Sequence, residues 1–569
     1  MRYWLALAFL RDFGFELDEW TPISLERLTK ALACTKRNAQ FVVKKLVEER
    51  VIDWQAGVGR GNLPKLKLLK DLAEPLHSQA RQWMQEGKTD QALMLIAVNE
   101  RDQFIAEFVS QYQTKSQSLD ILQVPFYRAT HSLVPSEISR RSEHHIASYL
   151  YARLLRYNPA TRSLEGDLAQ RWQHQGEVLQ LTLRKQLKFW DGSPLTAYEV
   201  QDVFDNLLKT DSVSLGLFHL IDEFKALDAT TLRVQSKALA NYLPMLMARG
   251  ALSVAKLTKN GWVGSGSFRL VEQTSYRTLL HASEHYHGFR PWLDGVEIWN
   301  MGQEAKEFTS HCDIVHGSLA PDTEEGFLQK QQWEQGCIYA FFNPSHHAWM
   351  KRLKHRKWLQ QQLLNLPLSG IKDDLLYRRS GGMTNLEPVV LGKCIEDIPV
   401  EGIAPLKVLT YQLSGHIETA ENILETLKKA GIRANLEVLA YPEFAKPEIQ
   451  ALADIIVSGE VFSEHLESAW LGWLLCTTTV QACLGGKLMQ STKNQVFEAL
   501  KLSDETSRIN AYRRIEKALI KKGLYLPLFQ CGQDMRISNK LSTMELLANG
   551  WIDFNQVVFQ TSNQSGIEQ

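Results

Sequence analysis

The chain has 569 residues, a net charge of zero at pH 7, 44% hydrophobic residues and 22% charged residues. This composition is ordinary for soluble proteins, and the length predicts more than one domain. No apolar run approaches the roughly 20 residues that a transmembrane helix needs, so we expect no membrane partner. The seven cysteines are odd in number and none forms Cys-x-x-Cys, which argues against a disulfide framework and a zinc site. We therefore expect no metal and no cofactor.

Residues 1–70 predict three helices followed by a hairpin. The apolar run Tyr3–Leu10 is interrupted by Arg11 and Asp12, and no small-x-small cleavage site follows. We interpret this run as a first helix and not as a signal peptide, and we expect a cytoplasmic protein. Ser24 predicts the cap of a second helix. The apolar stripe expected for that helix is Leu25, Leu28 and Leu32.

A third helix is predicted to begin at Thr35, whose hydroxyl can accept a hydrogen bond from a free backbone N–H of the first turn. One face shows apolar residues at helical spacing, namely Ala39, Val42, Val43, Leu46 and Val47. The start of the helix and its other face carry Lys36, Arg37, Asn38, Gln40 and Lys44. Side chains of these types hydrogen-bond base edges and phosphates in DNA.

Val51–Gln55 and Lys65–Leu69 predict a hairpin, because the glycines within Gly57–Gly61 permit a turn. Arg60 lies at its tip. The segment Cys34–Lys70 holds nine basic and three acidic residues, a local charge of +6. A basic helix followed by a basic hairpin is typical of a winged helix-turn-helix.

Double-stranded DNA at a promoter or operator is therefore the predicted partner of this segment. The expected base contacts are Lys36, Arg37, Asn38 and Gln40, with Thr35 at the helix start, and the expected phosphate contacts are Lys44, Arg60 and Lys65. The alternative is a solvated basic helix next to an ordinary hairpin. A dinucleotide-binding loop at Gly57–Gly61 is rejected, because Pro64 and a short strand follow it where a helix is required.

Residues 71–116 predict a helical connector, which leaves a homodimer surface open as an alternative. Its expected helices are Ala73–Glu86, Thr89–Val98 and Arg101–Tyr112, followed by a polar joint at Thr114–Ser118. Strands and helices then alternate. The expected elements include strands at Leu119–Phe126 and Val178–Arg184 and helices at Ser142–Leu155 and Thr196–Lys209. Lys407–Leu439 predicts a strand, a helix and a second strand, which implies a parallel sheet.

The stretch Leu181–Leu207 resembles the signature of the family 5 extracellular solute-binding proteins, the peptide-binding components of ABC transporters. The matching positions are Leu183-Arg184-Lys185, Phe189, Asp191–Ala197 and Val200. Three further stretches, Gly264–Phe268, Leu427–Val438 and Leu524–Phe529, are similar to later motifs of that family. Together with the winged helix, the whole chain resembles the SgrR-type transcriptional regulators. Residues similar to motifs of that group are Trp54-Gln55-Ala56, Val58–Gly61, Arg140–Glu143 and His145-Ile146-Ala147.

The resemblance implies a multidomain protein in which an α-rich winged helix-turn-helix precedes a two-lobed α/β domain, periplasmic-binding-protein-like and of type II. The expected parts are the winged helix at 1–70, the connector at 71–116 and the solute-binding domain at 117–569. Lobe one is expected to comprise 117–299 and 523–569, and lobe two 300–522. A ligand cleft that closes by hinge motion is implied between the lobes.

The expected ligand contacts are cations of lobe one and a stretch of lobe two. Arg128 follows the first predicted strand, where an arginine suits a phosphate or carboxylate, and Arg140 and Arg141 are second candidates. Gly459 and Glu460 lie where transporter proteins carry an Asp for a peptide amino group, but no Asp-Pro follows them here, so a peptide is not expected. The aromatic candidates for stacking on a sugar are Phe462, Trp470 and Trp473.

The leading interpretation is a cytoplasmic regulator that binds DNA and senses a small-molecule effector. The resemblance implies a signal of sugar-phosphate stress. The alternative is a peptide- or oligosaccharide-binding component of an ABC transporter. We expect no enzyme, because the sequence lacks Gly-x-Ser-x-Gly, His-Glu-x-x-His and a Walker loop.

Overall fold

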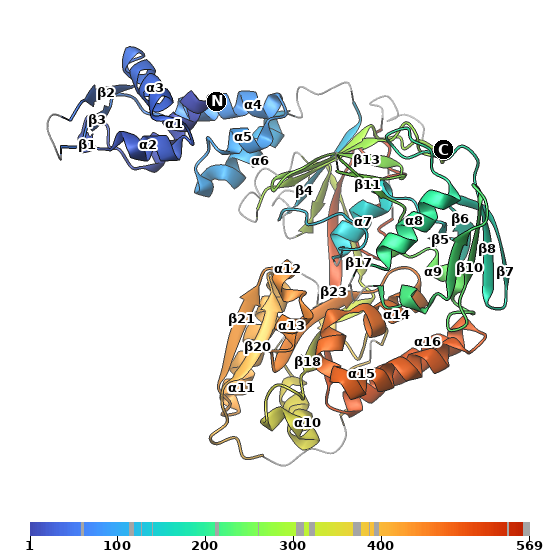
Figure 1. Cartoon of the computed structure of the whole chain (residues 1–569). Coiled ribbons are helices and arrows are strands. Elements are labelled where there is room, and N and C mark those ends of the chain that lie inside the picture. Colours follow the sequence, from blue (N-terminus) through green and yellow to red (C-terminus); the bar gives the residue numbers. More distant parts are fainter. Residues whose placement is uncertain are drawn as a thin grey trace.

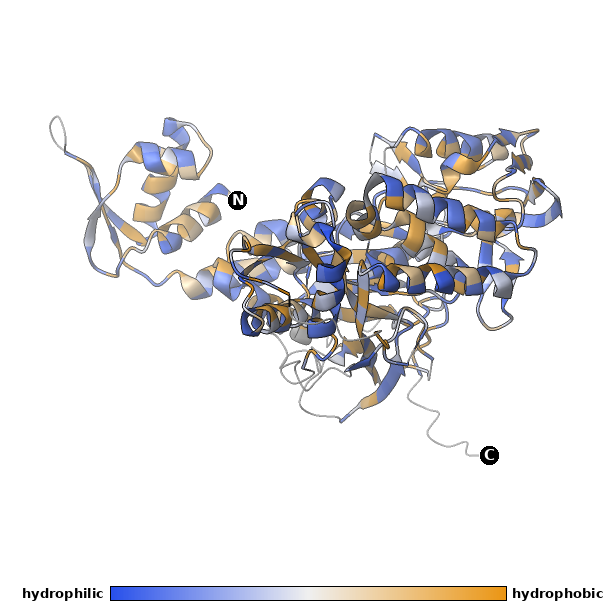
Figure 2. Ribbon diagram, turned by 90° about the horizontal axis from the view of Figure 1, so that it is seen from below, coloured by the Kyte–Doolittle hydropathy of each residue, from blue (hydrophilic) through white to orange (hydrophobic). Residues whose placement is uncertain are grey.

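The computed structural model describes residues 1–57, 62–112, 119–126, 128–138, 140–210, 215–259, 261–302, 312–317, 325–367, 377–385, 387–391, 398–542 and 545–560. An N-terminal part projects from one end of two larger lobes (Figure 1). In Figure 2, helices carry hydrophobic residues along one side and hydrophilic residues along the other, as expected for elements that cover a core. The predicted multidomain, two-lobed α/β organisation is confirmed. Within these ranges, no helix has the length and apolar character that a membrane span requires.

Residues 2–68 form a winged helix. Its helices are α1 (Arg2–Asp12), α2 (Leu25–Ala31) and α3 (Lys36–Glu48), and its strands are β1 (Trp20–Pro22), β2 (Ile52–Gln55) and β3 (Lys65–Leu68). Strand β3 lies between the other two and is antiparallel to both. The predicted helices and hairpin are confirmed. Strand β1 was not predicted, because it has three residues, ends in Pro22 and pairs only with a strand far along the chain.

The connector consists of α4 (Ala73–Gln85), α5 (Thr89–Leu93), a 3₁₀ turn η1 (Val98–Glu100) and α6 (Arg101–Tyr112). The three predicted helices are confirmed, although the second is shorter than expected. The predicted joint at Thr114–Ser118 lies outside the described residues.

The first lobe is built on two four-stranded sheets. One has the order β13-β14-β15-β4, with β13 (Phe268–Gln273), β14 (Arg277–Ala282), β15 (Gly295–Asn300) and β4 (Ile121–Phe126). The other has the order β7-β8-β10-β9, with β7 (Ala169–Gln175), β8 (Val178–Leu183), β10 (Thr231–Gln235) and β9 (Glu223–Ala226). Two hairpins, β5 (Leu155–Asn158) with β6 (Ser163–Gly166) and β11 (Lys256–Thr258) with β12 (Gly261–Val263), complete the strands of this lobe within the described ranges.

The helices of the first lobe cover these sheets. They are α7 (Arg141–Leu150), α8 (Ala197–Leu207) and α9 (Leu243–Leu246), with 3₁₀ turns η3 (Phe218–Leu220) and η4 (Gly250–Leu252). Thr196 and Glu199 form a capping box at the start of α8, as the predicted Thr196 cap requires. The predicted helix Ser142–Leu155 ends earlier, at Leu150, because Leu155 begins β5.

The largest sheet has the order β16-β23-β18-β22-β20-β21 and reaches from the second lobe into the first. Its strands are β16 (Ile314–His316), β17 (Phe327–Trp333), β18 (Gly336–Phe342), β19 (Tyr377–Arg379), β20 (Leu406–Tyr411), β21 (Ala434–Leu439), β22 (Ile455–Val461) and β23 (Tyr525–Ser538). The helices of the second lobe are α10 (Leu353–Leu363), α11 (Ser414–Lys429), α12 (Tyr441–Phe444), α13 (Pro447–Gln450), α14 (Leu466–Cys476), α15 (Thr478–Leu500) and α16 (Glu505–Lys521), with the turn η7 (Trp349–Lys351). The predicted parallel β20–α11–β21 unit is confirmed.

Strand β23 runs from one lobe to the other (Figure 1). Leu526 and Leu528 pack in the core of the second lobe, whereas Met535 and Ile537 pack in the core of the first. Ile314 also packs in the first-lobe core. The chain therefore changes lobe later than predicted at both places, after Ile314 and not at residue 300, and within β23 and not at residue 523.

Candidate nucleic-acid interface and effector site

Helix α3 is held on the winged helix by one apolar face. The Thr35 hydroxyl accepts a hydrogen bond from the Asn38 backbone N–H at 3.4 Å, which fixes the start of the helix. The buried residues of α3 are Ala39, Val42, Val43 and Leu46, and the last three join a core with Leu28 of α2 and Leu66 of β3. Val47, predicted to belong to this stripe, is 38% exposed, so that part of the prediction is wrong.

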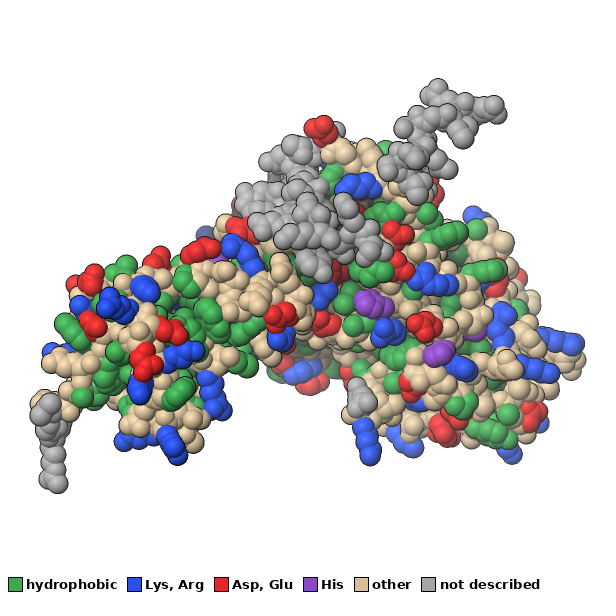
Figure 3. Space-filling model, turned by 90° about the horizontal axis from the view of Figure 1, so that it is seen from above, with side chains coloured by type: hydrophobic (Ala, Val, Ile, Leu, Met, Phe, Trp, Pro, Cys, Tyr) green, Lys and Arg blue, Asp and Glu red, His purple; other side chains and the backbone are tan. Residues whose placement is uncertain are grey.

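The other face of α3 is open to solvent. Its exposed polar residues are the predicted Thr35, Lys36, Arg37, Asn38, Gln40 and Lys44. Lys44 has only an exposed partner, Glu48, at 3.7 Å, and such a pair contributes little. Lys65 is exposed at the start of β3, and Arg60 lies outside the described residues. The N-terminal part projects from the lobes and carries Lys and Arg on its surface beside Asp and Glu (Figure 3).

Two further basic residues of this segment face carboxylates of the same domain. Lys45 lies 3.7 Å from Glu49, and Lys67 lies between Asp18 and Asp53 at 3.8 and 3.5 Å. The local charge of +6 already includes Glu49 and Asp53, and Asp18, which lies outside the segment, brings one further negative charge beside Lys67. The exposed cations of α3 are Lys36, Arg37, Lys44 and Lys45, and the last two each have an exposed carboxylate 3.7 Å away.

Arg128 does not present its charge to the space between the lobes. Its Nη1 donates to Oε1 of Glu143 at 2.6 Å, its Nη2 donates to Oε2 at 3.1 Å, and Nη2 also donates to the Ser142 hydroxyl. Burial acts to raise the pKa of Glu143, but the hydrogen bonds and charge of Arg128 outweigh it and hold that pKa at about 2. Arg128 is therefore a structural cation, and its predicted role as a ligand contact is wrong.

Arg140 and Arg141, at the start of α7, lie against the second lobe. The Arg140 guanidinium lies 4.3 Å from the centre of the Tyr441 ring and 5.6 Å from that of Tyr411. Arg141 donates to the buried carboxylate of Glu334. These contacts join the lobes at the edge where the parallel strands β20, β21 and β22 end.

Gly459 and Glu460 lie on β22 at the same edge. A Cβ on Gly459 would lie 2.7 Å from Nε2 of His416, so glycine is required where this ring approaches the strand. Burial raises the pKa of Glu460 to about 7, against the opposing charge of Arg141. Burial, with Arg140 and Arg141 nearby, lowers the pKa of His416 to about 3. The structure thus brings four predicted residues together: Arg140, Arg141, Gly459 and Glu460.

The aromatic candidates are core residues. Phe462, Trp470 and Trp473 are at most 1% exposed and belong to one large apolar cluster. Their predicted role as a sugar-stacking face is wrong, because they pack on one another and on Tyr525. Two rings that lie at the lobe interface beside Arg140, Tyr411 and Tyr441, were missed by sequence reasoning. The signal was available, because both lie at the carboxyl ends of predicted strands, where ligands of parallel sheets bind.

The two lobes also contact each other through a second set of residues. The Tyr242 hydroxyl lies 2.7 Å from the Ser468 hydroxyl, and Arg249 donates to the Ser468 carbonyl at 3.0 Å. Apolar residues of the first lobe, such as Leu243, and of α14, such as Leu471, belong to the same cluster. Opening the lobes would have to separate these contacts.

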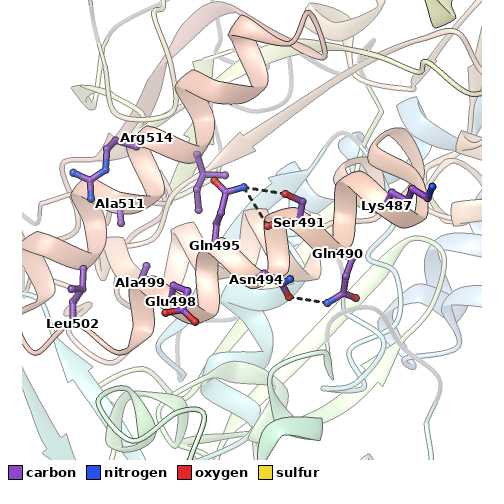
Figure 4. Close-up of a pocket in the computed structure, with 11 residues that line it drawn as sticks. Lys487, Gln490, Ser491, Asn494, Gln495, Glu498, Ala499, Leu502, Ala511 and Arg514 are labelled. Atoms are coloured by element: carbon purple, nitrogen blue, oxygen red, sulfur yellow. Dashed lines mark hydrogen bonds between the residues drawn. The ribbon is translucent and has the colours of Figure 1, made fainter.

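A groove of about 730 Å³ lies on the outer helices α15 and α16 (Figure 4). Polar residues along it bond to neighbours on their own helix: Gln490 donates to Asn494 at 2.9 Å and Gln495 to Ser491. None of the predicted ligand residues lines the groove. It is therefore a separate surface feature and not the predicted effector site.

The connector packs against the first lobe. Phe108 of α6 meets Trp299 of β15 edge to face, with ring centres 6.2 Å apart, and Arg101 donates to the Tyr276 hydroxyl at 3.1 Å. Trp299 and Val315 share one continuous apolar cluster with the connector and the winged helix. The connection between the modules is therefore a packed interface in addition to the covalent joint.

Two family models match parts of the chain. Residues 10–118 match the family model "Sugar transport-related sRNA regulator N-term", and residues 163–359 match "Bacterial extracellular solute-binding proteins, family 5 Middle". The Bacillus subtilis protein YhjP, described as uncharacterized, is 25% identical over 97% of this chain and 98% of its own. The HTH-type transcriptional regulator SgrR of Yersinia enterocolitica is 22% identical over 95% of both chains. Among solved structures, Burkholderia pseudomallei OppA has a TM-score of 0.65 at 16% identity, covering 78% of this chain and all of its own, which shows a shared fold.

Proposed function

Because the chain joins an SgrR-type N-terminal region to a family 5 solute-binding region, we propose that it is a DNA-binding transcriptional regulator that senses a small metabolite. The observation that carries this proposal is the two-faced character of α3. One face is buried in the winged helix, and the other presents Lys36, Arg37 and Gln40 to solvent. This is the arrangement by which a recognition helix enters the major groove.

The predicted roles on DNA follow from position. Residues at the start of α3 (Lys36, Arg37, Asn38 and Gln40) contact base edges, with Thr35 beside them, and Lys44, Lys65 and Arg60 contact phosphates. Selection of duplexes from a random DNA library with the full-length chain tests the proposal. Enrichment of one sequence family is the expected result, and no enrichment at low salt would contradict it.

The proposed effector is a small anionic metabolite, in the first instance a sugar phosphate. Support comes from the name of the N-terminal family and from the interface chemistry, since Arg140 and Arg141 bring positive charge beside Tyr411 and Tyr441. An anion would compete with Glu334 for Arg141. Calorimetry with hexose phosphates, free sugars and short peptides distinguishes the classes, and binding of peptides alone would contradict a sugar phosphate.

Effector binding is proposed to change the DNA affinity of the winged helix through the packed connector. The coupling must be reciprocal: an effector that tightens DNA binding tenfold is itself bound tenfold more tightly with DNA, about 1.4 kcal/mol in each direction. Strand β16 pairs with β23, which reaches both lobes, and Val315 of β16 lies in the cluster shared with the connector. Lobe movement thus has a physical route to α6.

A regulator of this kind works where the DNA is, so we propose a cytoplasmic location. The alternative, a transporter component, rests on the shared fold with oligopeptide-binding proteins. It requires export, so cell fractionation separates the two. Recovery of the protein in the periplasm or medium would contradict the regulator.

A further inference from the structure

Phe41 is a large apolar residue on the face of α3 that points away from the core of the winged helix. It is 70% exposed, whereas its neighbours Val42 and Val43 are buried. With about 3.6 residues per turn, Phe41 lies on the side of the helix opposite Ala39 and Leu46. Packing within the winged helix therefore does not account for a phenylalanine at this position.

The residues around Phe41 indicate what it meets. Arg37 and Lys44 lie four residues before it and three after it, so both are its neighbours on the helix surface, and both are exposed. Gln40 precedes it and is also exposed. An apolar ring between two cations fits a surface that is anionic overall and carries an apolar group. The major groove of DNA is such a surface, because each thymine presents its C5 methyl group between phosphate backbones.

We propose that Phe41 is a specificity-determining residue that contacts a thymine methyl group in the major groove, between the base contacts of Arg37 and Gln40 and the phosphate contact of Lys44. This inference rests on the proposed DNA-binding function. A second copy of the chain is a poorer occupant. A symmetric contact through Phe41 would bring Arg37 and Lys44 of both copies together, and like charges at an interface oppose association.

The test uses the full-length chain and the duplex enriched from the random library. Each thymine of that duplex is replaced in turn by deoxyuridine, which lacks only the methyl group. For the wild-type protein, one replacement is expected to weaken binding about fourfold, the effect of losing one buried methyl-sized contact. For Phe41→Ala, the same replacement is expected to leave the affinity unchanged, because the ring that contacts the methyl group is gone.

Val98→Ala is the matched control, because Val98 is 78% exposed and lies in the connector, away from α3. It should show the wild-type response to deoxyuridine, and Phe41→Leu should keep part of it. An identical deoxyuridine profile for wild type and Phe41→Ala would overturn the inference. A wild-type dimer that dissociates in sedimentation on Phe41→Ala, with an unchanged deoxyuridine profile, would also overturn the inference. The ring would then contact a second copy of the chain. Failure of the library to yield any DNA would instead contradict the proposed function itself.

Discussion

Arg128 and Glu143 show how a local pattern can suggest the wrong role. The arginine follows a strand end, as an anion-binding arginine would, yet a buried carboxylate with a side-chain exposure of 0% occupies it. Removing one partner of such a pair leaves an uncompensated buried charge. The pair therefore belongs to the stability of the first lobe.

Arg128→Ala is expected to lower the free energy of unfolding by about 3–5 kcal/mol, because Glu143 would remain buried without its cation. Arg128→Met combined with Glu143→Met should recover most of that loss, since neither charge remains. Denaturant titration of both variants measures the difference. A single variant as stable as wild type would show that Arg128 is not a structural cation.

Glu460 gives the lobe interface a pH dependence. Its pKa is raised from 4.5 to about 7, so the folded protein binds this proton more tightly than the unfolded chain does. The resulting stabilisation is full below about pH 4.5 and is lost as the pH rises through 7. The free energy of unfolding of the wild type minus that of Glu460→Gln should therefore fall by roughly 1–3 kcal/mol from pH 5 to pH 8.

Comparing the two proteins at each pH cancels the contributions of the other titratable groups, because both proteins contain them. Glu498→Gln serves as control, because that side chain is 71% exposed. Parallel stability curves for wild type and Glu460→Gln would contradict the raised pKa.

Among the elements, the connector is more than a covalent joint, because it packs against the first lobe. With a covalent joint alone, a flexible insert at Thr114–Ser118 would free the winged helix. The contacts of Phe108 with Trp299 and of Arg101 with Tyr276 predict otherwise. An insert of about ten Gly and Ser residues there should leave the radius of gyration almost unchanged, because the docked connector holds the module in place.

The double variant Phe108→Ala, Arg101→Ala should weaken the docking of the module and increase the radius of gyration in X-ray scattering, because it removes the ring contact with Trp299 and the hydrogen bond to Tyr276. Met94→Ala, at a 51% exposed side chain of the connector, is the control. If the insert increased the radius of gyration as much as the double variant Phe108→Ala, Arg101→Ala does, the packed interface would not be what holds the module in place.

Prediction from sequence succeeded where the determinants are local. The Thr35 and Ser24 caps, the stripe Ala39–Leu46 and the β20–α11–β21 unit each depend on residues within a few turns or strands. Prediction failed where the availability or exposure of a side chain depends on a residue that is distant in sequence. Whether Arg128 is available depends on Glu143, and whether Trp470 and Trp473 are exposed depends on Tyr525 and on α14 packing.

The same division between local and distant determinants holds for the candidate sites. The exposed face of α3 could be predicted, because the buried stripe defines its opposite. Tyr441 and Glu334 could not be assigned to Arg140 and Arg141, because those pairs form only when two lobes distant in sequence meet. Phe41 was passed over because an apolar residue in a helix is ordinarily assigned to the core.

At the scale of the whole molecule, a projecting winged helix is packed through a connector onto a two-lobed solute-binding fold. We propose that α3 reads a DNA sequence. The most direct measurement is the ratio of Kd values of the full-length chain for the enriched duplex and for a scrambled duplex, at one fixed salt concentration.

The ratio should be compared among wild type, Arg37→Ala and Lys30→Ala, where Lys30 is an exposed cation of α2. We expect Arg37→Ala to lose about 1–3 kcal/mol of discrimination and Lys30→Ala to keep the wild-type ratio. Equal discrimination by wild type and Arg37→Ala, or equal losses in both variants, would contradict the assignment of α3 as the reading helix.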